Sequence, residues 1–167
     1  KKGMVAMKGS YHGKSFGALS LTFNPKYRKA FAPLVEKVSF ASYGDMESLR
    51  SVVDDDTAFI ILEPIQGESG IIVAPDNFLQ QVRELCDEKG ILLIFDEIQA
   101  GLGRTGRLWA CDHWNTAPDI LCLAKGIAGG VPMGATLVRP DILSSMGKGE
   151  HSSTFGGNPI SCAAGTA

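Results

Sequence analysis

The apolar residues of this chain gather into short continuous runs, separated by segments with helical periodicity. Four runs have the length of buried strands, at residues 4–7, 58–62, 91–95 and 120–124. A continuous apolar run bounded by turn residues is typical of a strand in a parallel sheet that is covered on both faces. The pattern therefore predicts an α/β fold with three layers, a mostly parallel sheet between two layers of helices.

Two segments between these runs have the features of helices. Asp45, a favoured N-cap residue, precedes the first. The second is predicted to open at Pro75 and Asp76 and to end at Gly90, a residue typical of helix C-termini. Its apolar positions repeat at helical spacing: Phe78, Leu79, Val82, Leu85 and Cys86. Because this helix joins two predicted strands, the three elements form a β–α–β unit with an expected right-handed crossover.

Two predicted strands are each followed by a charged residue that a buried sheet normally excludes. Asp96 follows the run at 91–95, and Lys125 follows the run at 120–124. Ligands of parallel sheets lie beyond the carboxyl ends of the strands, so both side chains are expected at one edge, over one bound molecule. A charged residue in this place is also often only the first solvated residue of a loop. Small neighbours leave Lys125 open to a planar ligand, and desolvation there would lower its pKa and favour attack on carbonyl groups.

Six short motifs add a resemblance to these patterns. They lie at residues 11–13, 63–68, 96–101, 103–106, 123–126 and 153–159. In this order and spacing they resemble the class III aminotransferases, which are pyridoxal-phosphate (PLP) enzymes of fold type I. The similarity covers essentially the whole chain and is greatest to the acetylornithine and ornithine aminotransferases. It implies the large domain of that fold, with a strand at residues 135–138 that runs antiparallel to the others.

The resemblance implies a role for five residues. Lys125 matches the Schiff-base lysine, which also moves the proton between substrate and cofactor. Asp96 matches the carboxylate that keeps the pyridine nitrogen protonated. Gln99 matches the donor to the phenolic oxygen of PLP, and Tyr11 matches the aromatic residue stacked on the ring. Thr154 matches a residue that reaches the cofactor phosphate of the neighbouring subunit, which implies a homodimer with shared active sites.

Three further residues have less defined roles. Glu68 is similar to the glutamate that pairs, in ornithine-type enzymes, with an arginine of the C-terminal region, and that arginine is absent from these 167 residues. Glu63 is expected on the substrate side of the site or behind it, as a partner of other site residues. His12 lies beside a glycine in a tight loop, and we interpret it as structural rather than catalytic.

The two ends of the sequence indicate that the predicted large domain is incomplete. It begins without a methionine and ends partway along a predicted helix, which is typical of a fragment. By the resemblance, the main phosphate-binding turn should precede residue 1, and the small C-terminal domain should follow residue 167. We therefore expect residues 1–167 to be an incomplete PLP-binding large domain that is inactive by itself.

The implied reaction transfers an ω-amino group from an ornithine-, acetylornithine- or lysine-like donor to 2-oxoglutarate, in arginine or lysine biosynthesis. A 4-aminobutyrate or diamine aminotransferase of the same class is the alternative among enzymes. A non-catalytic remnant of the fold is the alternative outside enzymes. The joint presence of Lys125, Asp96 and Gln99 argues against a remnant, which has no reason to keep a buried amine.

Composition narrows the remaining classes of protein. A net charge of −2 and a pI near 5.9 argue against a surface for nucleic acid or anionic membrane. No apolar run approaches the roughly 20 residues that span a bilayer. The four cysteines lack C-x-x-C spacing, which favours a reduced, cytoplasmic protein. Cys111 and His113 have no second pair of ligands at metal-binding spacing, so no metal site is predicted.

Residues 101–106 match the dinucleotide-binding pattern G-x-G-x-x-G. In that motif the glycines join a strand directly to a helix. Here residues 96–100 separate the predicted strand from the first glycine, and no helical pattern follows. We interpret the segment as a loop that passes tightly over the site.

Overall fold

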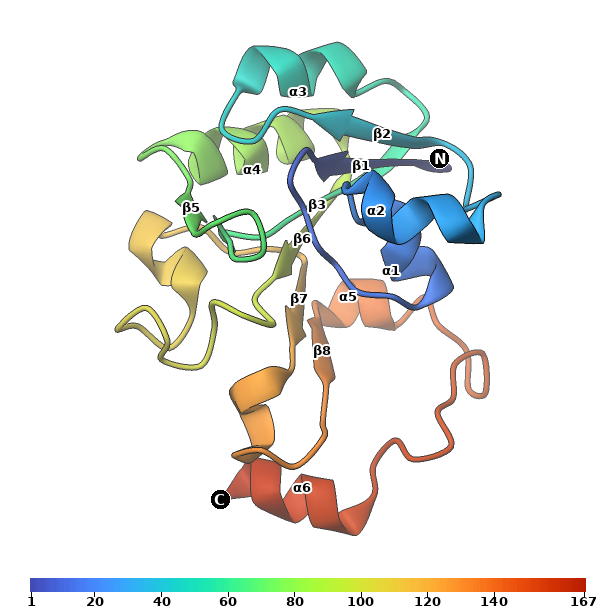
Figure 1. Ribbon diagram of the computed structural model, residues 1–167, viewed down its shortest axis with the longest axis vertical. Helices are drawn as coiled ribbons and strands as arrows, with labels where there is room; N and C mark the ends of the chain where they lie inside the picture. Colours follow the sequence, from blue (N-terminus) through green and yellow to red (C-terminus); the bar gives the residue numbers. More distant parts are fainter.

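The computed structural model describes residues 1–167 and contains a six-stranded sheet (Figure 1). From one edge to the other, the strands are β2 (Val38–Ala41), β1 (Gly3–Met7), β3 (Thr57–Leu62), β6 (Leu92–Asp96), β7 (Ile120–Leu123) and β8 (Ala135–Val138). The first five are parallel, and β8 runs antiparallel to β7. The predicted α/β class, the five predicted strands and the antiparallel direction of β8 are confirmed, and β2 is a strand that was not predicted.

Helices cover both faces of this sheet. The helices α1 (Phe16–Leu21) and α2 (Pro25–Arg28) connect β1 to β2, whereas α3 (Met46–Val52) and α4 (Phe78–Lys89) lie in the connections that lead to β3 and β6. The chain steps toward one edge of the sheet from β1 to β2, and toward the other edge afterwards. Because crossovers between parallel strands are right-handed, opposite steps place their helices on opposite faces.

Alternate side chains of one strand enter two different cores. Val5 and Met7 of β1 belong to the larger core, which also holds Leu49 of α3 and the apolar face of α4. Ala6, between them, packs in a smaller core with Leu21 of α1. Both faces of the central strands are therefore dry, which explains why the strands appear as continuous apolar runs rather than alternating ones.

The two predicted helix starts have different outcomes. Asp45 caps α3 as predicted, because its side chain accepts a hydrogen bond from the backbone N–H of Ser48 at 3.0 Å. The second helix begins at Phe78, later than predicted. The Phe78 N–H bonds to the carbonyl of Pro75 at 3.0 Å, so a turn precedes the helix. The helix ends at Lys89, and Gly90 follows as its C-cap in the left-handed conformation with φ 59°, as predicted.

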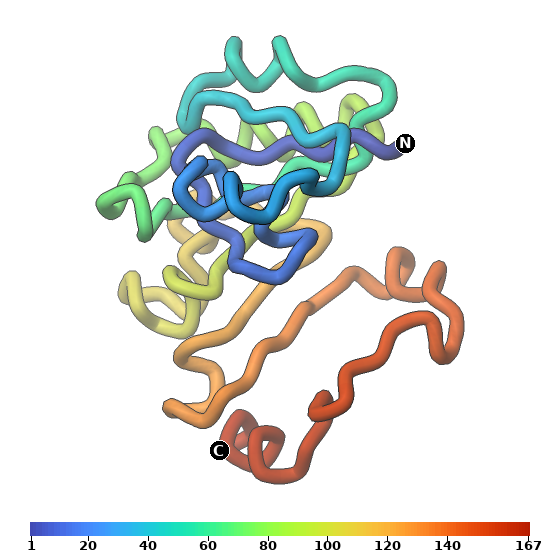
Figure 2. The backbone as a smooth tube through the Cα atoms, turned by 45° about the vertical axis from the view of Figure 1, so that its right-hand side comes forward, coloured from blue at the N-terminus to red at the C-terminus, as the bar shows by residue number.

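Apart from the helix at the end of the chain, the sequence pattern did not predict the shorter elements. A hairpin of β4 (Ile65–Gln66) and β5 (Ile72–Val73) follows β3. The remaining elements are the 3-10 helices η1 (Lys29–Phe31), η2 (Ala110–Trp114) and η3 (Lys125–Ala128), and the helices α5 (Pro140–Leu143) and α6 (Pro159–Thr166). After β8 the chain forms an arm beside the rest of the molecule and returns through α6 to η3 (Figure 2). None of the helices combines the length and the apolar character needed to cross a membrane.

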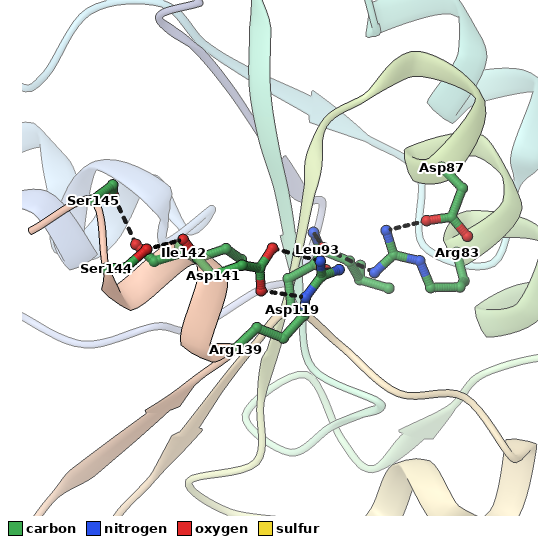
Figure 3. Close-up of polar contacts among 9 residues, drawn as sticks. All are labelled: Arg83, Asp87, Leu93, Asp119, Arg139, Asp141, Ile142, Ser144 and Ser145. Carbon is green, nitrogen blue, oxygen red and sulfur yellow. Dashed lines mark hydrogen bonds and ion pairs between the residues drawn. The ribbon is translucent and has the colours of Figure 1, made fainter.

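A buried carboxylate fixes the end of the sheet opposite to the predicted site (Figure 3). Asp119, just before β7, accepts hydrogen bonds from Arg83 at 2.9 Å, from Arg139 at 2.6 Å and from the N–H of Leu93 at 2.8 Å. Burial by itself would raise the pKa of Asp119, but the Leu93 N–H and the two arginines outweigh it and hold that pKa below its usual range. The carboxylate thus ties α4, β6 and β8 to the start of β7.

Candidate active site

The carboxyl ends of β6 and β7 bring an acid and an amine to one cavity. Asp96 is the last residue of β6, and Lys125 opens η3 directly after β7 and Ala124. Both line a cavity of about 80 Å³. The other residues of its wall are Tyr11, His12, Gly13, Glu63, Ile98 and Gln99. The predicted meeting of Asp96 and Lys125 at one edge of the sheet is confirmed.

Lys125 has an unusual backbone conformation, and its amine has one neutral hydrogen-bond partner. Its Nζ donates to Oε1 of Gln99 at 3.2 Å, and no carboxylate pairs with it. Its φ of 49° lies in the left-handed region, which non-glycine residues rarely adopt outside functional or strained positions. The residue is exposed, so the predicted desolvation of its amine is wrong.

Asp96 is buried and has two fixed hydrogen bonds. Its Oδ1 accepts from the N–H of Ile98 at 3.0 Å, and its Oδ2 lies 2.8 Å from Nδ1 of His12. The His12 side chain is only 2% exposed, and its Nε2 is buried without a partner. The tautomer with a proton on Nδ1 therefore suits this site, because it donates to Asp96 and leaves no buried N–H unpaired.

His12 therefore belongs to the site, although its sequence context indicated only a structural residue. The signal that would have placed it here is topological. The strand β1 runs parallel to β3 and β6, so the residues that follow Met7 reach the same edge of the sheet as Asp96. A histidine in that loop faces a strand-end acid 84 positions away, a separation that no local pattern reports.

Gln99 and Tyr11 complete the wall around the acid and the amine. Since a lysine ammonium only donates hydrogen bonds, the atom of Gln99 that faces Lys125 is its carbonyl oxygen. The NH2 group of the same amide is then available to donate to a ligand. The Tyr11 ring packs edge to face against Tyr27, with 5.5 Å between centroids. These positions are compatible with the predicted roles of Gln99 and Tyr11, which remain predictions.

The two glutamates predicted on the substrate side occupy different environments. Glu63 is buried, and its two oxygens accept from the N–H groups of Tyr11 at 3.0 Å and Gly67 at 3.2 Å. Burial raises the pKa of Glu63, and these two N–H groups oppose that shift. Glu68 is exposed and lies outside the cavity, where it accepts a hydrogen bond from the hydroxyl of Tyr27 at 2.9 Å. Glu63 therefore supports the wall of the site, and Glu68 lies beside it.

Thr154 and the glycine-rich loop lie outside the cavity wall. Thr154 is exposed on the arm between α5 and α6 and does not line the cavity of its own chain. Residues 101–106 form successive turns and do not open a helix, as the sequence predicted. Glu97 fixes the far end of this loop, because its carboxylate accepts from the N–H groups of Ala110 and Cys111, both at 2.7 Å.

Comparison with known proteins identifies the family. The model of the family described as aminotransferase class III matches residues 1–167. The chain belongs to the class III aminotransferases. It is 51% identical to the acetylornithine aminotransferase of Methanopyrus kandleri over 160 residues, which cover 96% of this chain and 41% of the relative. It is 50% identical to the putrescine aminotransferase of Pectobacterium atrosepticum over 172 residues, which cover 98% of this chain and 37% of the relative.

A solved structure shares the fold of this class III aminotransferase chain. The ornithine aminotransferase of Toxoplasma gondii, crystallised in the presence of oxidised glutathione with partial occupancy of PLP at its active site, matches with a TM-score of 0.94. The match has 38% sequence identity and covers 98% of this chain and 39% of that one. The chain thus spans about two fifths of the length of these relatives.

The cavity residues fit PLP, the cofactor of this family. An aldehyde cofactor needs an amine, and Lys125 supplies it without a competing carboxylate. A protonated pyridine nitrogen needs an anionic partner, and Asp96 is a buried carboxylate supported from behind by His12. A phenolic oxygen needs a donor, and the NH2 group of Gln99 is available. The donors and acceptors of the cavity therefore match the polar groups of the cofactor ring.

Proposed function

We propose that the complete protein is a PLP-dependent transaminase whose chemistry is centred on Lys125 and Asp96. The observation that carries this proposal is that β6 and β7 bring a buried carboxylate and an unpaired amine to one cavity. In the same proposal, residues 1–167 are part of the PLP-binding large domain. Its support is that the chain matches about two fifths of each relative.

Five of the cavity residues have assigned tasks in this proposal. Bound PLP supplies an electron sink for charge that develops on the substrate carbon. Lys125 holds the cofactor and, once released, carries a proton at Nζ to and from that carbon. Asp96 holds a proton at the ring nitrogen, and Gln99 donates to the phenolic oxygen. Tyr11 stacks on the ring, and His12 keeps the Asp96 carboxylate in place.

The proposed donor carries an ω-amino group on an ornithine-, acetylornithine- or lysine-like skeleton, and 2-oxoglutarate is the proposed acceptor. Relatives named acetylornithine and ornithine aminotransferase, at 51% and 48% identity, support this choice. A relative named putrescine aminotransferase, at 50% identity, supports a diamine donor as the alternative. A cytoplasmic location belongs to the same proposal, supported by the four free cysteines.

A donor panel tests the proposed function. We supply the complete protein with PLP and 2-oxoglutarate and measure the glutamate formed. We expect kcat/KM for N-acetylornithine or ornithine to be at least about tenfold higher than kcat/KM for putrescine or 4-aminobutyrate. A preference of this size needs only about 1.4 kcal/mol of differential transition-state binding. Preference for putrescine would favour the diamine alternative. Absence of glutamate with every donor would contradict the proposal.

Thr154 is proposed to serve the site of a partner subunit in a homodimer. Its support is that Thr154 is exposed and lies outside the cavity of its own chain. Mixing complete Thr154→Ala protein with complete Lys125→Ala protein should raise activity above the sum of the two preparations. In the hybrid dimer one site then carries both defects and the other carries neither. If Thr154 acts on its own chain, every hybrid site keeps one defect, and subunit exchange produces no gain.

A further inference from the structure

Gly67 lies against Gln99, and its lack of a side chain leaves space for the Gln99 amide. A Cβ atom added to Gly67 would overlap Cδ and Oε1 of Gln99, and it would lie 2.5 Å from Nε2. Such an approach is far shorter than any van der Waals contact, so an alanine and the present Gln99 amide cannot occupy this space together. The backbone of Gly67 is not in the left-handed region, so its φ angle does not require glycine. The requirement for glycine is therefore one of space.

The backbone of Gly67 is itself fixed from both sides of the loop. Its N–H donates to Oε2 of Glu63 at 3.2 Å, and the other oxygen of Glu63 accepts from Tyr11 N–H at 3.0 Å. The hydroxyl of Tyr43 donates to the carbonyls of Glu63 at 3.0 Å and Pro64 at 2.7 Å. One buried carboxylate thus connects the loop of Tyr11 to the loop of Gly67, and the start of the second loop is anchored.

The same contacts lead from Gly67 to the reactive amine. The Gln99 amide touches both residues: it lies against Gly67, and its carbonyl oxygen accepts a hydrogen bond from Nζ of Lys125 at 3.2 Å. Gln99 is the only hydrogen-bond partner of that amine in the chain. Because all three end atoms of Gln99 overlap the added Cβ, the amide has to leave its present place, and with it the one polar contact that orients Lys125 changes.

We infer that Gly67 is a positioning residue of the active site, held by Glu63, which sets the place of the Gln99 amide and through it the orientation of Lys125. The inference rests on the proposed function for its catalytic consequence only. The physical link from Gly67 through Gln99 to Lys125 is tested without the cofactor. Gly67 touches no reacting group and acts through the amide.

The first test measures the reactivity of Lys125 in the PLP-free complete protein. Brief acetylation with acetic anhydride, followed by peptide mass mapping, gives the labelling rate of Lys125 relative to Lys148. In Gly67→Ala the displaced amide releases the amine, and we expect labelling at least about twofold faster, the factor for loss of one weak hydrogen bond. Glu63→Gln should act in the same direction, because its amide NH2 would face a backbone N–H. Gly17→Ala is the matched control, since Gly17 lies on α1 with open space around it.

The second test is a double-mutant cycle in the transamination assay. Gly67→Ala should lower kcat by roughly tenfold in the parent and by less than about twofold in Gln99→Ala. The second loss is smaller because the added Cβ overlaps only the Gln99 amide, which that background lacks. Equal losses in both backgrounds would overturn the inference, since the glycine would then act through its backbone. An unchanged labelling rate in Gly67→Ala would also overturn it.

Two safeguards separate the possible failures. If Gly67→Ala does not fold, Gln99→Asn takes its place in the labelling test, because the shorter amide withdraws from Lys125 and should give the same faster labelling. Unchanged labelling in a folded Gln99→Asn protein would then overturn the inference. If the complete protein transaminates no donor, the proposed function fails, while the labelling of PLP-free protein still decides the link from Gly67 to Lys125.

Discussion

Lys125→Ala should abolish transamination by the complete protein, with a fall of at least about 10⁴-fold in the rate of a single half-reaction. The size follows from the two tasks assigned to this amine. General acid–base catalysis alone contributes about 10²–10⁴-fold, and covalent attachment of the cofactor is lost at the same time. Lys125 is the only lysine in the cavity wall, so no other amine can replace it. The rate is measured by stopped-flow absorbance after one addition of amino donor.

Covalent mapping of the cofactor separates this role from a general loss of structure. Borohydride reduction of the PLP-loaded protein should leave a pyridoxyl group on the peptide that contains Lys125. Lys148→Ala is the control, because Lys148 is exposed on the arm and outside the cavity. It should keep the parent rate. A pyridoxyl group on Lys89 or Lys148 instead would contradict the assignment.

The central part of the fold was predictable because its signals are local. Each buried strand is dry on both faces, so a window of about five residues, such as 91–95, is sufficient to recognise it. The parallel direction of β6 and β7 then places Asp96 and Lys125 at one edge without further information. A strand in a one-sided sheet would have shown only an alternating pattern and a weaker signal.

The details of the site were not predictable, because they depend on contacts between distant segments. His12 meets Asp96 through the folding of the loop after β1. The glycine at 67 has no special φ, so its requirement appears only when Gln99 is placed beside it. The exposure of Lys125 was also not predicted, because it depends on which distant segments cover the amine. A sequence shows which residues are small, but it does not show what fills the space that they leave.

The cavity wall contains two buried carboxylates, Glu63 and Asp96, which have different hydrogen-bond partners. Glu63 uses both oxygens on backbone N–H groups. Asp96 has one oxygen on a backbone N–H and the other on His12. Each oxygen of both carboxylates keeps a second lone pair, and both residues line the cavity. What differs is the kind of partner: Glu63 is held by backbone N–H groups of two loops, whereas Asp96 is paired with the ring of His12.

Asp96→Asn should lower the half-reaction rate by at least about 100-fold while the fold stays nearly intact. Preorganised electrostatic partners of this kind contribute about 10²–10³-fold. The substitution removes the negative charge that holds a proton at the ring nitrogen. It also turns an NH2 group toward Nδ1 of His12, which must then accept and carry its proton on Nε2. That atom is buried without a partner, so we expect a further loss of about 1–3 kcal/mol of stability.

The matched control for this substitution is Asp45→Asn. Asp45 caps α3 and does not line the cavity, and asparagine is an equally good N-cap, so both stability and rate should stay near those of the parent. The decisive measurement is the half-reaction rate of each variant at saturating PLP, with urea denaturation to follow stability. Because Asp96 acts on charge that develops during the reaction, its loss should appear in kcat more than in the affinity for PLP. A half-reaction rate within a few-fold of the parent in a protein that binds PLP would show that Asp96 only caps its strand.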